Sequence, residues 1–422
     1  MPDARTAMTV ELRRTLISDA YGDWEFLREP SKTAPDLIAI SQSYSQDAET
    51  PDRWRRSASG ATFAVQPFGR TLRLQSASLL SVHHYAPASL LPVKVRISYH
   101  IATGPVTFEL GNPDTQDSQT IASGDGSVEL SASTPGSRWR LTATINGAGA
   151  NRDARLRTVR LWEYCDLEPW LDGLATTEAS ATVVTKPILF SFKGSHFVWT
   201  DKSVELTLLV PTSESLFLSQ LDDLLSVRSP HRYPLELFVD GFVWRCAAAE
   251  LERSSAGGPL LRLRLRLTLQ APFAKSETDT FSSASGTSLP LQLTLTLPSQ
   301  AAETPVLVGC ALASGASPAA IRFTAQPSNS SVTFAPDIIN APVTYFLHTD
   351  TVLWSGTTDD GVITNKTHLI RSFRNLPLTL LPGINTVTME FLDNTGNQII
   401  TVPNTVTLAL RTTEQRTEVI LA

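Results

Sequence analysis

The residues of this chain best suited to direct chemistry are aromatic rings that stand among polar neighbours. A flat ring matches the apolar face of a pyranose sugar, so an exposed tryptophan or tyrosine is a candidate sugar-stacking platform. Trp54, in the polar run DRWRRS, fits this description best; Tyr44 and Trp139 are further possible glycan contacts, and Trp24 and Tyr85 complete the set. The alternative for each ring is a place in a hydrophobic core or its lid.

No sequence pattern indicates catalysis or a resident cofactor. The chain has no GxSxG, P-loop, HExxH or EF-hand pattern, and its seven histidines have neither a nearby nucleophile nor metal-ligand spacing. Asp359 and Asp360 form a turn that could contact calcium, although a solvated turn is the simpler interpretation. Carboxylate pairs that cleave glycosides are assembled in space and leave no local spacing. We therefore expect no enzymatic activity, no catalytic residue, no metal and no cofactor.

Composition narrows the class of protein further. A chain of 422 residues is too long for one core and predicts two to four domains. With a net charge of −6 and no strongly basic region, it has no nucleic-acid footprint. The absence of a long apolar run, and a start without an apolar signal core, predict a soluble globular protein that is neither Sec-exported nor inserted in a membrane. Cys165, Cys246 and Cys310 lack paired spacing and predict reduced, buried thiols.

Residues 21–165 alternate short strand-like runs with turns rich in glycine, asparagine and aspartate, the pattern of a β-sandwich. In the run VKVRISYHI, the side chains of one face are apolar: Val93, Val95, Ile97 and Tyr99. The pattern and the closing strand RLRTVRLWEY resemble the jelly rolls of carbohydrate-binding modules, which implies glycan binding. Residues 1–20 form an N-terminal arm, either a strand or an ordered lead-in.

The central region, residues 186–275, contains the one segment with a helical period. A helix over 213–227 places its apolar residues on one face, namely Leu216, Phe217, Leu221, Leu224 and Leu225. Strand-like runs precede and follow it, so we expect a small antiparallel β-barrel with one α-helix. Residues 166–185 are interpreted as a linker, and the polar run at 274–288 as a second boundary or an extended loop.

Residues 286–422 predict a second β-sandwich that is poor in charge and rich in threonine, valine and leucine. Near its end lies the motif RNLPLTLLPGINTV, residues 374–387. Its proline fixes φ, its glycine relieves the turn, and Asn385 can bond back to the backbone.

This motif resembles the signature near the end of siphophage distal tail proteins, where a strand, a Leu-Pro-Gly turn and an Asn-Thr pair begin a strand of a galectin-like sandwich. The order of strands, helix and hairpin in the central region is similar to the ring-forming barrel of that family. The resemblance covers residues 180–422, roughly; the N-terminal sandwich is a departure. It implies an all-β structural protein of the virion, assembled in the host cytoplasm as a homo-hexameric ring that joins the tail tube protein to the tail hub and adhesion proteins.

The run LLRLRLRLTL offers a physical reason for ring assembly. Strand alternation places Arg262, Arg264 and Arg266 on one face and leucines on the other. The arginines could pair with acidic groups of the next subunit or line the ring opening. The alternative is an ordinary solvated outer face of the sheet.

Two functions therefore follow from the sequence. The preferred one is a subunit of the phage tail tip or baseplate that forms a ring and contacts host polysaccharide through its accessory sandwich. The alternative is a carbohydrate-active protein, secreted or cytosolic, with a glycan-binding module attached to a glycosidase-like domain.

Overall fold

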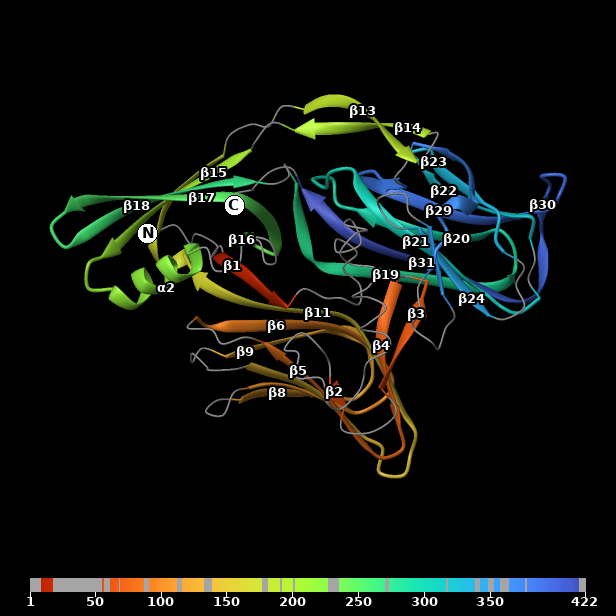
Figure 1. Ribbon diagram of the computed structural model, residues 1–422, viewed down its shortest axis with the longest axis horizontal. Helices are drawn as coiled ribbons and strands as arrows, with labels where there is room; N and C mark the ends of the chain where they lie inside the picture. Colours follow the sequence, from red (N-terminus) through yellow and green to blue (C-terminus); the bar gives the residue numbers. More distant parts are fainter. Residues whose placement is uncertain are drawn as a thin grey trace, which may run out of the picture.

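The computed structural model is almost entirely β and falls into three connected units (Figure 1). It describes residues 9–17, 55–56, 61–67, 69–86, 91–111, 116–132, 139–176, 181–189, 192–199, 202–226, 235–269, 273–315, 318–337, 342–347, 353–356, 364–375 and 378–416. The predicted all-β class with two sandwiches is confirmed.

The N-terminal unit is a sandwich of two antiparallel sheets. One sheet has the order β3 (Ala61–Gln66), β4 (Gly69–Ser76), β11 (Arg152–Asp166), β6 (Val93–Thr103) and β9 (Gly124–Ala132). The other has the order β2 (Arg55–Arg56), β5 (Leu79–Ala86), β10 (Trp139–Asn146), β7 (Val106–Gly111) and β8 (Gln116–Ile121). Along β6, buried and half-buried residues alternate as the sequence predicts, and the buried ones enter the core between the sheets.

The central unit is an open, curved sheet. Its order is β11, β1 (Val10–Ile17), β16 (Leu235–Val239), β17 (Phe242–Gly257), β18 (Leu260–Leu269), β15 (Ser203–Pro211) and β12 (Leu171–Thr176). The described part of the predicted arm thus forms β1, a strand inside the sheet. The predicted barrel is wrong for the described strands, because β11 pairs with β1 on one side and β6 on the other, so the sheet continues into the N-terminal sandwich.

The predicted helix is α2 (Ser215–Leu225), which covers one face of the central sheet. Phe217, Leu221 and Leu224 are buried at helical spacing and belong to the same hydrophobic core as the leucines of β15 and β18, while the helix itself lies beside β11 and β1. Leu216 was expected on this face, but it is 69% exposed. It stands one residue before Phe217, and one residue along a helix is a rotation of about 100°, which turns its side chain away from the buried face. Arg14 of β1 donates to the carbonyl oxygens of Leu224 and, at 2.8 Å, Ser226, which satisfies the end of the helix.

The segment that the sequence indicated as a linker contains regular structure. A short 3-10 turn, η2 (Glu168–Trp170), leads into β12, and a hairpin of β13 (Ala181–Leu189) and β14 (Phe192–Trp199) follows. Figure 1 shows this hairpin arching over the molecule.

The C-terminal unit is the second sandwich. One sheet contains β19 (Ala274–Ser288), β31 (Thr401–Arg416), β21 (Thr304–Leu312), β24 (Val343–Leu347), β25 (Leu353–Gly356) and β26 (Thr364–Asn365), with β28 (Thr379–Leu380) also beside β21. The other contains β20 (Leu291–Leu297), β29 (Gly383–Leu392), β22 (Ala320–Gln326), β23 (Ser330–Phe334) and β27 (Ile370–Arg374); β30 (Gln398–Ile399) pairs with β29, and η3 (Thr367–Leu369) precedes β27.

The Leu-Pro-Gly turn has the geometry that its residues predict. Gly383 has φ +97°, a region that L side chains rarely adopt. The buried Asn385 side chain accepts from the Leu381 amide at 2.9 Å and donates to the carbonyl oxygens of Leu381 and Gly383 at 2.7 and 2.9 Å. The predicted bond of Asn385 back to the backbone is confirmed.

Strand β19 connects the central unit to the C-terminal sandwich. The sequence indicated a boundary or loop here, but the residues form one long strand that pairs with β17 at its start and with β31 along its length. The predicted loop is wrong, because β19 is stabilised by pairing with strands distant in the sequence, and its polar composition shows no apolar repeat.

The N-terminal and C-terminal sandwiches also touch at Gly309 of β21. A Cβ placed there would overlap the carbonyl oxygen of Pro67, the residue that follows β3. We expect Gly309→Ala to lower stability by about 1–3 kcal/mol, as overpacking does, and to expose this contact to proteolysis. Gly173→Ala is the matched control, because a Cβ there meets nothing within 4 Å. Equal thermal unfolding of the two variants would contradict the prediction.

Candidate functional site

Buried charges join the three units at one junction. Arg13 of β1 donates through Nε to Glu11 Oε2 at 2.7 Å and through Nη1 to Glu277 of β19. All three side chains are at most 5% exposed. The Arg13 guanidinium also lies over the rings of Trp162 and Phe238, 4.6 and 3.6 Å from their centroids. One arginine thus contacts β1, β11, β16 and β19.

The N-terminal sandwich contributes two more cations to this junction. Lys94 Nζ lies 2.6 Å from Glu11 Oε1, and Arg96 Nη1 lies 2.7 Å from Glu277 Oε2. Both cations come from β6, and their side chains are about one-fifth exposed. Each buried carboxylate therefore has two cationic partners, which offsets the cost of removing it from water.

A second buried ion pair locks β19 to β31. Arg411 donates through Nε and Nη2 to Asp279 Oδ2 at 2.9 and 2.6 Å, and Thr413 Oγ1 donates to Oδ1 at 2.5 Å. Burial alone would raise the pKa of Asp279, but the charges of Arg411 and Arg160 and the hydrogen bonds hold it below its ordinary value. Asp279 therefore stays ionised at neutral pH.

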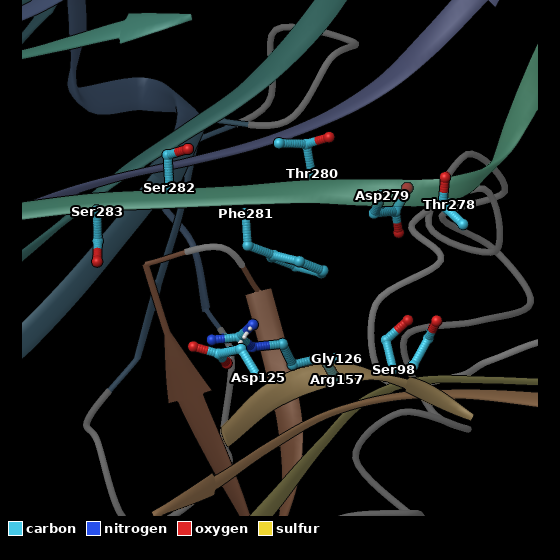
Figure 2. A pocket seen from close by; sticks show the side chains of 11 residues that line it. Ser98, Asp125, Gly126, Arg157, Thr278, Asp279, Thr280, Phe281, Ser282 and Ser283 are labelled. Atoms are coloured by element: carbon cyan, nitrogen blue, oxygen red, sulfur yellow. Dashed lines mark ion pairs between the residues drawn. The ribbon is translucent and has the colours of Figure 1, made fainter.

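A cleft of about 390 Å³ lies beside this pair, between the N-terminal sandwich and β19. Figure 2 shows Asp279, Phe281 and Ser283 directed from β19 toward Asp125 and Arg157 of the sandwich. Ser98 and Ser127 complete its polar rim, together with the remaining lining residues Gly126, Thr278, Thr280 and Ser282.

Two planar groups meet inside the cleft. Arg157 Nη1 pairs with Asp125 Oδ1 at 2.9 Å, and its guanidinium carbon lies 4.6 Å from the centroid of the Phe281 ring. His100 Nδ1 lies 2.9 Å from the same Asp125 oxygen. Asp125 is 59% exposed, so this carboxylate faces solvent while its partners hold it in place. Local sequence patterns single out none of these lining residues as a binding site, because they come from segments far apart in the chain.

The arginine row lies on the exposed face of β18. Arg262, Arg264 and Arg266 are exposed, whereas the leucines between them are buried. Arg264 Nε lies 3.1 Å from Glu205 Oε1 of β15, and Nη1 lies 3.8 Å from Glu252 Oε2 of β17. Arg264 therefore makes ion pairs within its own chain, while all three arginines of the row are exposed.

Of the predicted sugar-stacking rings, the structure describes the side chain of Trp139 alone. Trp139 is fully buried in the core of the N-terminal sandwich, and a ring without exposed surface cannot stack on a sugar, so its interpretation as a glycan contact is wrong. Trp54, Tyr44 and Trp24 lie outside the described residues, as do Asp359 and Asp360 of the candidate calcium turn. Tyr85 belongs to β5, but its side chain is not among those described.

The cysteines are buried free thiols, as predicted. Burial raises the pKa of Cys165 and Cys246 to about 12 and also raises that of Cys310. In the part of the chain that the structure describes, no group of three or more histidine, cysteine, aspartate or glutamate side chains could hold a metal ion. Among these same residues, no helix is long and apolar enough to cross a membrane.

No family model and no curated protein matches the chain. Similar solved structures include the Dit protein of phage SPP1, with 10% identity over 59% of this chain and 95% of that one, and a TM-score of 0.35. They also include a chain of the phage P2 baseplate, with 8% identity over 59% and 93% and a TM-score of 0.26. A third is the TmCBM61 module bound to β-1,4-galactotriose, with 9% identity over 26% and 88% and a TM-score of 0.23. At these values, the chain is similar to phage baseplate proteins and carbohydrate-binding modules without being shown to belong to either family.

Proposed function

We propose that this chain is a structural subunit of a phage tail tip, placed at the distal end of the tail and repeated in a homo-hexameric ring. Its central sheet would pack against the next copy, and its contacts along the axis would be with the tail tube protein, the hub and the adhesion proteins. The observation that carries the proposal is the accessible arginine row on β18, set on a unit joined to both sandwiches. The Leu-Pro-Gly motif of residues 374–387 and the order of strands, helix and hairpin in the central region support the same assignment.

The buried junction suits such a subunit. An assembly protein must hold its domains at set angles so that repeated contacts close into a ring. The charges on Glu11, Arg13 and Glu277 are satisfied only when β1, β6 and β19 keep their relative positions. Removing one unit would leave buried charges without partners, which opposes relative motion.

The proposed role is non-enzymatic, with host glycan bound by the N-terminal sandwich or its border. The polar cleft favours this part of the proposal. The same cleft also supports the second candidate, a carbohydrate-active protein whose N-terminal module binds glycan.

Imaging of intact particles tests the position. Purified virions carrying an epitope tag on this chain should show six copies of label at the distal end of the tail. A turnover screen with polysaccharides serves as the second arm. Label elsewhere in the particle, or robust hydrolysis by the purified chain, would contradict the proposal.

The arginine row gives a sharper test of the ring. We expect Arg262→Glu with Arg266→Glu to reduce ring assembly at least tenfold, because two exposed cations at the interface become anions. The fold should be unaffected, since both side chains are exposed. The matched control is Arg140→Glu with Arg371→Glu, which reverses two exposed charges on the sandwiches. Incorporation into particles measures the effect, and equal incorporation of both double variants would exclude the row from the interface.

A further inference from the structure

The cleft between the N-terminal sandwich and β19 contains both hydrogen-bond donors and hydrogen-bond acceptors. Asp125 supplies carboxylate acceptors, and the hydroxyl groups of Ser98, Ser127 and Ser283 both donate and accept. Asp125, Ser127 and Ser283 are exposed, so a solute can reach them. At about 390 Å³, the cleft has the size of small-ligand sites, which lie preferentially where domains meet.

The charges of the cleft compensate each other. Asp125 pairs with Arg157, and Asp279 pairs with Arg411. A bound anion would meet the exposed Asp125 carboxylate, and a bound cation would meet the Arg157 guanidinium. A neutral ligand avoids both repulsions and can use the acceptors and hydroxyl groups together.

The cleft is also organised before any ligand arrives. Arg157 packs over Phe281, and both His100 and Arg157 contact the Oδ1 atom of Asp125. Polar groups that are already positioned lose little conformational freedom on binding, which favours ligands that need several simultaneous hydrogen bonds. Neutral sugars have this chemistry, because each ring carries several hydroxyl groups that donate and accept.

We propose that this cleft binds a neutral sugar, a mono- or disaccharide unit of a surface glycan. The inference rests on the glycan-binding part of the proposed function and gives it a site. The site belongs to two units, since Asp125 and Arg157 come from the N-terminal sandwich and Ser283 from β19. A bound sugar would therefore bridge the two units.

Two tryptophan substitutions on one strand test the site. Ser283→Trp fills the cleft, and Ser285→Trp is the matched control, two residues along the same exposed face of β19 and outside the lining. A glycan array with neutral and acidic oligosaccharides, followed by calorimetric titration of the retained glycan, measures binding to the full chain. Wild type and Ser285→Trp should bind a neutral glycan equally, and Ser283→Trp should bind at least tenfold more weakly.

A milder change tests the chemistry of the same site. Asp125→Asn keeps the shape and removes the charged acceptor, so binding should weaken on the order of tenfold. Asp172→Asn, at an exposed carboxylate of β12, should leave binding unchanged. Thermal unfolding of each variant separates loss of the site from loss of the fold.

The possible outcomes are distinct. Unchanged binding by Ser283→Trp, or equal loss in Ser285→Trp, would overturn the cleft while leaving the glycan role. Retention of acidic glycans alone would overturn the neutral class. A wild-type chain that binds no glycan would overturn the cleft and the glycan role together. None of these results alters the ring proposal, which the imaging of particles decides.

Discussion

Asp279→Asn is expected to destabilise the C-terminal sandwich by about 3–5 kcal/mol, the usual cost of removing one partner from a buried ion pair. The Asp279 and Arg411 side chains are 6% and 9% exposed, so solvent cannot replace the lost carboxylate. Arg411 would keep its charge but lose the carboxylate whose Oδ2 accepts from both its Nε and its Nη2, and Thr413 would face an amide. Calorimetric unfolding should show the transition that contains β19 and β31 at a lower temperature.

The pH dependence of the stability lost in Asp279→Asn shows whether the lost charge is its cause. The folded-state pKa of Asp279 lies below its ordinary value, so the carboxylate contributes stability at neutral pH. That contribution begins to disappear as the pH falls below about 4, the ordinary value, and is lost as the pH passes through the lower folded pKa. Wild type and Asp279→Asn should therefore differ at pH 7, and the difference should shrink as the pH falls from about 4 through the folded pKa. Asp172→Asn, at an exposed carboxylate, should stay within about 0.5 kcal/mol of wild type at neutral pH. A difference between Asp279→Asn and wild type that persists in acid would assign the loss to packing instead of charge.

Arg13→Met is expected to have the second-largest effect, a loss of about 3 kcal/mol, at the lower end of the range for a broken buried pair. Methionine keeps much of the apolar contact with Trp162 and Phe238 but removes the cation between Glu11 and Glu277. The loss is moderated because Lys94 still neutralises Glu11 and Arg96 still neutralises Glu277. Thermal unfolding of the whole chain measures it, and limited proteolysis should show earlier cleavage between the units.

A matched control and a double-mutant cycle isolate the junction. Arg264→Met removes an arginine whose side chain is 54% exposed, so its effect should stay below about 1 kcal/mol. Arg13→Met combined with Glu277→Gln should cost less than the two single changes added together, since both remove the same contact. Strict additivity would show that Arg13 stabilises the chain through its other contacts and not through Glu277.

Much of the secondary structure could be predicted from local patterns. The alternation in β6 predicted which residues enter the core, and the spacing of Phe217, Leu221 and Leu224 predicted α2. The alternating leucines and arginines of β18 predicted its two faces, one buried and one exposed. The turn at Asn385 followed from its own residues. In each case the physical cause lies within a few neighbouring residues.

The candidate site was beyond such reasoning. Asp125, Arg157 and Phe281 come from three strands separated widely in sequence, and only the packing of β19 against the N-terminal sandwich brings them together. Trp139 is a residue that the sequence proposed for a site and the structure removes from it. Its polar neighbours in the sequence do not reveal that its own side chain points into the core.

The sequence by itself determined which residues of β6 and β18 face inward, where the helix lies and how the Leu-Pro-Gly turn is built, because alternation, helical period and turn chemistry act over short distances. The tertiary structure alone decided that β1 is a strand of the central sheet, that β19 is a strand and not a loop, and that the central sheet continues into the sandwich instead of closing. Strand pairing depends on which edges are available, and that depends on the whole chain, since an edge is satisfied equally well by any strand that reaches it.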